Sequence, residues 1–318
     1  MNEQFLGVLK PSVIEIDEGS VGQRIDNFLF TRLKGVPKSH IYRILRSGEV
    51  RVNGGRIQPQ RRLDAGDKIR IPPIRVAQRE ADATPEGSVR ARLEPRVLYE
   101  DEDFLVINKP AGMAVHGGSG VSLGVIEGLR KIRPEAKFLE LVHRLDRDTS
   151  GCLLIAKKRS ALRGLHELFR SDHQVKKVYM ALLSGVWARK QLTVDAPLKK
   201  NVLQSGERMV KVAADGKPAL TEFRRIRKYS VATLVEASLL TGRTHQIRVH
   251  AQSLGHPIAG DERYGDARSN LALRQQGLKR LFLHAAELGF NHPRTQQPFH
   301  IKAPLDSELE NFLLQLVQ

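Results

Sequence analysis

Four apolar runs, each short enough to form a single strand, dominate the sequence beyond residue 97. They read FLVIN at 104–108, CLLIA at 152–156, VYMALLSG at 178–185 and ATLVEASLL at 232–240. Runs of this length and composition predict buried β-strands. The stretch 178–240 contains no helical segment long enough for a parallel crossover, so its strands should be joined in antiparallel fashion. The pattern therefore predicts an α+β fold with a mixed, largely antiparallel sheet.

Helical periodicity separates and follows these runs. Apolar residues recur at intervals of three and four within 122–132, 161–171 and 306–317. Such spacing places the apolar side chains on one face of a helix. We therefore predict helices over these three ranges.

The segment from about 19 to 72 has a pattern of its own. Apolar residues at helical spacing begin at Ile25, a second short helix follows Pro37, and 49–52 and 68–71 have the character of strands. The stretches QRIDNFLFTRL, KSHIYRILRSGEVRVNGGRI and LDAGDKIRI resemble the small RNA-binding module named after ribosomal protein S-four. This resemblance implies an N-terminal RNA-binding domain.

Residues 76–95 separate this segment from the apolar runs. They are charged, free of aromatic residues and nearly free of apolar periodicity. Such a composition is typical of a tether between domains. The sequence therefore predicts an S-four-like domain at 1–75, a linker at 76–95 and a second, larger domain at 96–318.

The chain is strongly basic. Its 318 residues include 52 Lys and Arg against 35 Asp and Glu, which gives a formal net charge of +17 and a pI of about 10.2. Such a charge predicts a polyanionic partner, and nucleic acid is favoured because no basic amphipathic helix with a Trp/Phe/Leu face is present. Aromatic residues make up only 5%, which argues for recognition of phosphates and shape over stacking on bases.

Part of this charge gathers on the second N-terminal helix. Its apolar residues Ile41 and Ile44 predict the buried face, so Lys38, Arg43 and Arg46 fall on the other side. There they are placed to follow a phosphate backbone. A charged helix face is also typical of a surface that contacts only solvent.

Features of the chain also bear on its compartment. No apolar run approaches the ~20 residues that span a bilayer, and the acidic first residues do not match a signal peptide. The single cysteine, Cys152, cannot form an internal disulfide and fits a reducing environment. We expect a cytoplasmic protein that does not bind membranes.

A polar loop between apolar segments, HRLDRDTSG at 143–151, is placed to present a reactive side chain. Asp146 is the candidate. The alternative is a turn aspartate held by Arg144 or Arg147. Asp148 is the competing acid, but an acid directly before such a turn more often accepts hydrogen bonds from its backbone.

Two more segments supply candidate side chains. The stretch TGRTHQIRVHAQSLG predicts a helix that begins with Thr244 as its N-cap and ends at Gly255, with Arg243 and Arg248 near its start. The alternative is a basic surface helix. Tyr179 lies within an apolar strand, where a core tyrosine with a bonded hydroxyl is the alternative to a functional one.

Neither a metal nor a nucleotide is predicted from local patterns. His245 and His250 are five residues apart, about 140° around a helix, whereas zinc-binding helices space their histidines by four. The loop NKPAGMAVHGGSG, which contains Lys109, lacks the Walker pattern of nucleotide-binding loops. We expect no metal site and no bound nucleotide.

In their order, NKPAGMAVHGG, HRLDRDTSG, KVYMALLSG and GRTHQIRVH, followed by LHAAEL, resemble the pseudouridine synthases of the RluA family over about 97–305. The resemblance implies that 96–318 is a catalytic domain of pseudouridine synthase type. It implies that Asp146 is the catalytic aspartate, that Tyr179 lies under the base, and that Arg248 pairs with the aspartate. An isomerase of this kind needs no cofactor, because the reaction involves neither redox chemistry nor net hydrolysis.

The same resemblance implies RNA contacts. Arg144 matches the arginine that helps to hold a flipped-out nucleotide, while Lys109 and Arg243 match weaker RNA-contacting positions. The HGGSG loop, HRLDRDTSG and KKRSALRGLHE are most similar to the C-type enzymes that act on large-subunit (23S) ribosomal RNA. We therefore expect large-subunit ribosomal RNA as the partner of a monomeric enzyme that modifies specific uridines.

Three alternatives remain open. The D-type paralogues share the two-domain layout and act on other large-subunit uridines. A non-catalytic ribosome assembly factor fits the basic charge equally well, but it needs neither an acid nor a phenol at a fixed place. A glycosidase or nuclease would need a second acid near Asp146, where only Asp148 is available.

Overall fold

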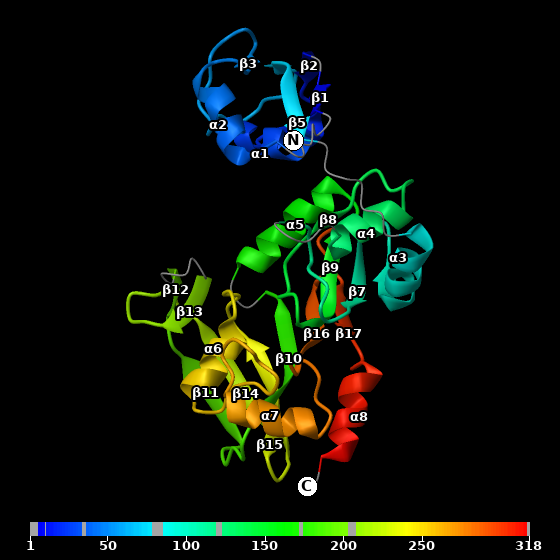
Figure 1. Ribbon diagram of the computed structural model, residues 1–318. Helices are drawn as coiled ribbons and strands as arrows, with labels where there is room; N and C mark the ends of the chain where they lie inside the picture. Colours follow the sequence, from blue (N-terminus) through cyan, green and yellow to red (C-terminus); the bar gives the residue numbers. More distant parts are fainter. Residues whose placement is uncertain are drawn as a thin grey trace. The chain divides into compact units, whose positions relative to one another are not determined.

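The structure is a computed structural model that describes residues 6–9, 11–33, 36–77, 85–118, 123–171, 174–202 and 208–316. The chain divides into two compact units, Met1–Ala83 and Thr84–Gln318. Figure 1 shows the elements of both units, most of them labelled.

In the N-terminal unit, two helices pack on a small antiparallel sheet with the order β2-β4-β3. Both predicted helices and the predicted strand at 68–71 are confirmed. The elements are β1 (Leu6–Leu9), β2 (Ser12–Glu15), the 3-10 helix η1 (Glu18–Ser20), α1 (Ile25–Arg32), α2 (Lys38–Arg46), β3 (Arg51–Val52), β4 (Lys68–Ile71) and β5 (Ile74–Ala77). β1 and β5 form a separate antiparallel pair.

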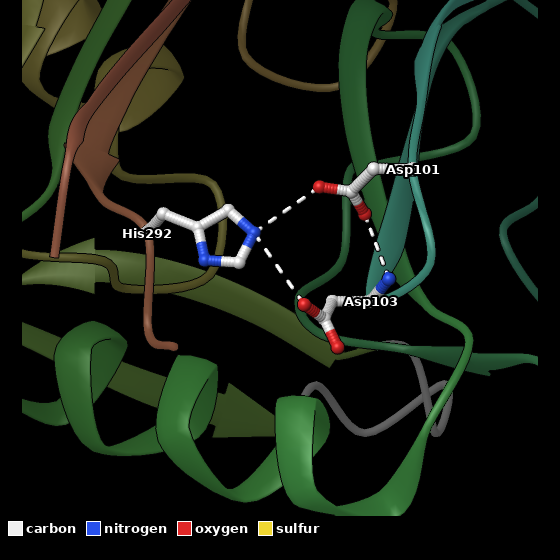
Figure 2. Close-up of side chains that lie close together, drawn as sticks. All are labelled: Asp101, Asp103 and His292. Atoms are coloured by element: carbon white, nitrogen blue, oxygen red, sulfur yellow. Dashed lines mark hydrogen bonds and ion pairs between the residues drawn. The ribbon is translucent and has the colours of Figure 1, made fainter. Parts of the chain in front are cut away.

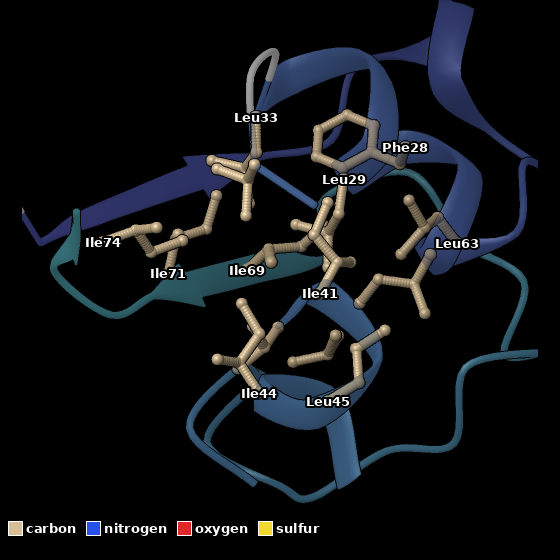
Figure 3. Close-up of a cluster of buried hydrophobic side chains, with 14 of the residues drawn as sticks. Phe28, Leu29, Leu33, Ile41, Ile44, Leu45, Leu63, Ile69, Ile71 and Ile74 are labelled. Atoms are coloured by element: carbon tan, nitrogen blue, oxygen red, sulfur yellow. The ribbon is translucent and has the colours of Figure 1, made fainter. Parts of the chain in front are cut away.

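A single apolar cluster lies between these helices and the sheet (Figure 3). Leu29 of α1, Ile41 and Ile44 of α2 and Ile69 of β4 are fully buried in it. Each such side chain contributes about 1.5–3 kcal/mol on burial. Because Ile41 and Ile44 fix the inner face of α2, its basic residues are held on the outer face.

The segment expected to be a linker is partly helical. Residues 78–84 lie outside the described residues, but Glu86–Leu93 forms α3 and Glu94–Arg96 a 3-10 helix, η2. Val89 and Leu93 of α3 are buried in the same cluster as Leu129. The expectation of a tether is therefore wrong from residue 86 onward, because two apolar residues four apart suffice to dock a short helix.

The C-terminal unit is built around one large sheet. Among the described residues it contains ten strands, in the order β11-β14-β15-β10-β16-β9-β7-β6, with β17 beside β16 and β8 beside β9. All of these pairs are antiparallel except β16 with β9. The predicted α+β fold with a mixed, largely antiparallel sheet is confirmed.

The strands of this unit are β6 (Val97–Glu100), β7 (Phe104–Lys109), β8 (Glu140–Leu141), β9 (Ser150–Ala156), β10 (Lys176–Ser184), β11 (Gln191–Asp195), β12 (Leu198–Val202), β13 (Arg208–Val212), β14 (Leu220–Lys228), β15 (Ala232–Leu239), β16 (Leu283–Asn291) and β17 (Pro298–Lys302). Its remaining helices are α4 (Val125–Ile132), α5 (Arg159–Arg170), α6 (Gln246–Ser253), α7 (Ala267–Gln275) and α8 (Ser307–Gln315). β12 and β13 form a separate hairpin sheet. No helix in the described part of the chain is long and apolar enough to span a bilayer.

Helices cover both faces of the central strands. Successive side chains of a strand point to opposite faces, so each strand contributes residues to the clusters on both sides of the sheet. In β7, Leu105 shares a buried cluster with Leu129 of α4, whereas Phe104 shares one with Leu165 of α5. This explains why the run at 104–108 is apolar without alternation.

The same alternation in β10 decides where Tyr179 lies. Leu183 shares a cluster with Ile247 of α6, while Leu182 packs with Phe312 of α8 on the opposite face. Tyr179 is four residues before Leu183 and packs against the same cluster as Ile247. Its side chain is therefore on the α6 face of the sheet.

A glycine permits the close approach that begins β9. Gly151 has φ +108°, and a Cβ at this position would lie 2.2 Å from the carbonyl oxygen of Ala285 in β16. Only glycine tolerates both the backbone conformation and the contact. Gly151 thus fixes the exit of the HRLDRDTSG loop against β16.

Candidate active site

Two adjoining pockets lie within the C-terminal unit. The smaller, of about 420 Å³, is lined by Asp146, Tyr179 and Arg248, the three residues predicted to be catalytic. The larger, of about 1040 Å³, shares Asp146, His245 and Arg248 with it. The structure therefore brings together side chains that are far apart in the sequence.

Asp146 lies in a turn that precedes β9, where its backbone carbonyl accepts a hydrogen bond from the N–H of Thr149 at 3.2 Å. Its carboxylate is held by neither Arg144 nor Arg147. The Nη1 of Arg248 donates to Asp146 Oδ2 at 3.3 Å. One carboxylate oxygen of Asp146, Oδ2, is thus held by Arg248.

Arg248 is anchored more firmly to a second acid. Its Nε and Nη2 each donate a hydrogen bond of 2.8 Å to the carboxylate of Asp261, which is a bidentate ion pair. Asp261 is 1% exposed. Burial raises the pKa of Asp261, but hydrogen bonds from Arg248 and from the backbone N–H groups of Tyr264 and Arg263 hold it below its usual value. Asp261 therefore remains ionised and fixes the guanidinium.

The sequence interpretation missed Asp261. It lies in GDERYG, beyond the predicted helix, and no local pattern marks it. The signal was indirect: the resemblance paired Arg248 with the catalytic aspartate, and a guanidinium buried in this way requires further acid partners.

Tyr179 points from β10 into the smaller pocket. Burial raises the pKa of its phenol above the ordinary value of 10, and the charge of Asp146 raises it further. At neutral pH the hydroxyl therefore keeps its proton. Such a side chain offers a flat apolar ring and a neutral O–H, not a phenolate base.

His245 lies at the start of α6 and also contacts Asp146. Its Nε2 is 3.6 Å from Asp146 Oδ2, and its Nδ1 is 2.7 Å from the hydroxyl oxygen of Tyr264. The residue has φ +55°, in the left-handed region. The prediction that Thr244 is the N-cap is therefore wrong, because the helix begins at Gln246 and His245 precedes it. The side-chain oxygen of Gln246 accepts a hydrogen bond from the backbone N–H of Arg243 at 3.0 Å.

Lys109 does not reach solvent, contrary to its predicted role as an RNA contact. Its ammonium group is fully buried and donates to the carbonyl oxygens of Pro110, Met113 and Arg147 at 2.8, 2.7 and 3.0 Å. Burial lowers its pKa to about 7. Lys109 instead joins its own loop to the loop that carries Asp146.

The other predicted RNA-contacting residues are exposed. Arg144 lines both pockets, and Arg243 lies at the rim of the smaller one, with its Nε donating to the carbonyl of Pro218 at 3.0 Å. On α2 of the N-terminal unit, Lys38, Arg43 and Arg46 are all exposed. These side chains can meet a polyanion without rearrangement of the core.

Among the described residues, one group has the composition of a metal site: Asp101, Asp103 and His292 (Figure 2). Nδ1 of His292 accepts the backbone N–H groups of Arg294 and Thr295 at 3.2 and 3.3 Å. The proton therefore lies on Nε2, which faces Asp101 at 3.1 Å and Asp103 at 3.6 Å. A cation would have to displace this proton, so the group fits a polar link between two turns better than a metal site.

Comparisons with known proteins agree with this geometry. Residues 103–253 match the family described as RNA pseudouridylate synthase, and residues 23–69 match the S4 domain. The ribosomal large subunit pseudouridine synthase C of Salmonella typhimurium is 60% identical over 304 residues, which cover 95% of each chain. The enzyme of that name from Escherichia coli strain K12 is 59% identical over 307 residues, covering 96% of each chain.

Solved structures of two human proteins are similar to the chain. Human RNA Pseudouridylate Synthase Domain Containing 4 has 26% identity and a TM-score of 0.59, covering 72% of this chain and 95% of its own. Human RNA Pseudouridylate Synthase Domain Containing 1 has 28% identity and a TM-score of 0.58, covering 71% and 88%. Together with the nearly full-length relatives, these matches show that the chain belongs to the RNA pseudouridylate synthase family.

Proposed function

We propose that the protein isomerises specific uridines in large-subunit (23S) ribosomal RNA to pseudouridine. The relatives that share 59–60% of its sequence over 95–96% of its length carry the name of that activity. The observation that carries the proposal is the pocket in which Asp146, Tyr179 and Arg248 meet. A clamp that only bound RNA would need no carboxylate held in this way.

The chemistry requires a carboxylate that acts on the sugar. The bond between C1′ and N1 of uracil breaks, a bond between C1′ and C5 forms, C5 loses a proton and N1 gains one. Asp146 acts either as a nucleophile or as a base toward the sugar, and both routes need it ionised in a site largely closed to water. We assign this role to its Oδ1, because Oδ2 already faces Arg248.

Arg248 supports the ionised carboxylate. An opposite charge within about 4–6 Å favours the charged form of an acid and offsets the cost of desolvation. Asp261 holds the guanidinium in one orientation, so its Nη1 stays directed at Asp146. In our proposal, Arg248 therefore acts on the charge of Asp146 and contacts no phosphate.

Tyr179 lies under the uracil in this proposal. Its partly buried ring supplies a flat surface in the pocket, and its raised pKa disfavours a phenolate that would take the C5 proton directly. A base inside an RNA helix cannot reach the pocket, so the target must be flipped out at a cost of a few kcal/mol. Arg144, which is exposed and lines both pockets, is placed to fill the space that the flipped base leaves in the RNA helix.

Binding of the RNA relies on charge spread over the chain. The net charge of +17 supplies attraction to phosphates, and the exposed Lys38, Arg43 and Arg46 supply it on the N-terminal unit. We further propose that the enzyme acts as a monomer in the cytoplasm, where its ribosomal substrate is present.

The proposal is tested with unmodified 23S ribosomal RNA transcribed in vitro. Purified protein is incubated with this RNA, and pseudouridines are mapped by their carbodiimide adducts. We expect conversion of a small set of uridines by the parent protein and none by an Asp146→Asn variant. An RNA that binds the parent protein but gains no pseudouridine would overturn the proposal.

A further inference from the structure

Three polar groups connect the β12–β13 hairpin to the catalytic carboxylate. The backbone N–H of Val210 in β13 donates to the hydroxyl oxygen of Tyr264 at 3.0 Å. The same oxygen lies 2.7 Å from Nδ1 of His245. On the other side of the ring, Nε2 of His245 lies 3.6 Å from Oδ2 of Asp146.

The hydrogen-bond requirements of Tyr264 select one tautomer of His245. The Tyr264 side chain is 2% exposed, and its oxygen already accepts the N–H of Val210. Its own O–H therefore needs an acceptor, and among the described residues only Nδ1 of His245 is within reach. Leaving a buried hydroxyl proton unbonded is unfavourable. Nδ1 therefore accepts, and the imidazole proton lies on Nε2.

We infer that His245 is a positioning residue for the reaction: Tyr264 fixes its tautomer, and its Nε2–H, together with Arg248, holds Oδ2 of Asp146 so that Oδ1 faces the substrate. This inference rests on the proposed role of Asp146. At 3.6 Å the Nε2–H acts on the carboxylate through charge and dipole, since a full hydrogen bond would be shorter.

The backbone of His245 supports a functional role for this placement. A φ of +55° is uncommon for a residue with a side chain. Here the conformation directs the ring between Tyr264 and Asp146, with the ring of Tyr264 edge-on at 5.4 Å.

The charges around His245 keep the ring neutral. Those facing it are Asp146 from the HRLDRDTSG loop, Arg248 from α6, and Asp261 and Arg263 from the loop after α6. Burial lowers the pKa of His245, Asp146 raises it in part, and the two arginines lower it again. A neutral ring donates from Nε2 without adding a proton that could pass to Asp146.

Two substitutions separate this role from simple packing. His245→Asn keeps the left-handed backbone, which asparagine tolerates, and retains an acceptor near Tyr264, but it removes the donor facing Asp146. His245→Gln places an amide N–H near the position of Nε2 instead. His256→Asn serves as the matched control, because Nδ1 of His256 lies 2.9 Å from the carbonyl oxygen of Ser184 and the residue lines neither pocket.

The readouts are the single-turnover rate at saturating 23S RNA across pH and the RNA dissociation constant. For His245→Asn we expect a rate about three- to tenfold lower, less than the loss of a full hydrogen bond to a charged group would cause. We also expect the acid limb of its pH profile to move to higher pH, while the dissociation constant changes less than threefold. His245→Gln should recover much of the rate, and His256→Asn should match the parent.

Other outcomes would overturn the inference. A parental rate and pH profile for His245→Asn would show that the donor is not needed. Equal losses in His245→Asn and His245→Gln would show a packing role, and a loss confined to binding would make His245 an RNA contact. Failure of the proposed function is distinguishable from all of these, because then the parent protein itself would form no pseudouridine.

Discussion

The guanidinium of Arg248 makes its two shortest hydrogen bonds, 2.8 Å each, to Asp261 and not to Asp146, the aspartate that we propose to be catalytic. Its third nitrogen reaches Asp146 at 3.3 Å. The arginine is thus fixed by one acid and acts on another. This arrangement gives the site a charge whose position does not depend on Asp146 or on the substrate.

The first prediction concerns Asp146 itself. Asp146→Asn should lower the single-turnover rate by at least about 10²–10⁴-fold, because an amide is neither a nucleophile nor a base. RNA affinity should stay within a few fold of the parent. The matched control is Asp148→Asn, since Asp148 is exposed in the same turn. This substitution should lower the rate far less. Near-parental turnover by Asp146→Asn would reject the assignment.

The second prediction concerns the anchor of Arg248. Asp261→Asn removes one partner of a buried ion pair, so the free energy of unfolding should fall by about 3 kcal/mol. Turnover should fall as well, because the guanidinium of Arg248 loses the contact that fixes its orientation. Glu262→Gln is the control, since Glu262 is exposed and its ion pair with Arg274, at 3.4 Å, should contribute less than about 1 kcal/mol. Urea unfolding of both variants measures the difference, and equal stabilities would contradict it.

The third prediction separates the charge of Arg248 from its geometry. Lysine keeps a positive charge but cannot reproduce the two-pronged contact with Asp261. Arg248→Lys should therefore lower the single-turnover rate more than RNA affinity. Arg248→Met should in addition shift the acid limb of the rate profile to higher pH, because the remaining carboxylate takes up a proton more readily. If the variants bind RNA weakly but keep the parental rate and pH profile, Arg248 contacts a phosphate and does not act on Asp146.

The fourth prediction concerns the basic face of α2. A triple variant, Lys38→Gln, Arg43→Gln and Arg46→Gln, should bind RNA less tightly and with a flatter salt dependence. Each duplex phosphate that the protein no longer neutralises removes about 0.9 from the slope of log affinity against log salt. The measurement is RNA binding between low and moderate salt.

A second triple variant controls for net charge. Arg51→Gln, Lys68→Gln and Arg70→Gln remove the same charge from exposed positions of β3 and β4 in the same unit. If both triples flatten the slope equally, the effect is one of total charge, and α2 is not the RNA-contacting face.

The elements of the fold were predictable because their signals are local. The apolar run at 104–108 and the helical spacing around Ile41 each follow from the residues themselves, and both elements are present. The start of α6 was not predictable, because it depends on the side chain of Gln246 folding back onto the loop before it. The helix α3 was also missed, since only Val89 and Leu93 distinguish it from a charged tether.

The candidate site was predictable to the extent that its residues fall in ordered motifs. Asp146, Tyr179 and Arg248 line one pocket, as the resemblance implied. Asp261 was not found, because its importance comes from a contact across 13 positions of the chain with Arg248. For Lys109, the resemblance implied an RNA contact, and only the tertiary structure shows the three carbonyls around its ammonium group.

The last prediction follows from the burial of Lys109. Lys109→Met should leave RNA affinity unchanged, because the ammonium group does not reach solvent. It should lower the free energy of unfolding, since methionine cannot donate hydrogen bonds to the carbonyls of Pro110, Met113 and Arg147. At roughly 1 kcal/mol for each bond, the decrease is about 3 kcal/mol.

The size of this decrease should depend on pH in a defined direction. Burial lowers the pKa of Lys109 to about 7, whereas an unfolded lysine titrates near 10.5. Between these values the unfolded chain binds a proton that the folded protein does not, so the parent gains stability as pH rises. The Lys109→Met variant lacks this pH-dependent contribution to the free energy of unfolding. The contributions of all other titratable groups are the same in both proteins and cancel in the difference. Urea unfolding at pH 7, 8.5 and 10 should therefore show a gap that widens with pH. A gap that stays constant or narrows would mean that Lys109 remains charged in the folded protein throughout this range.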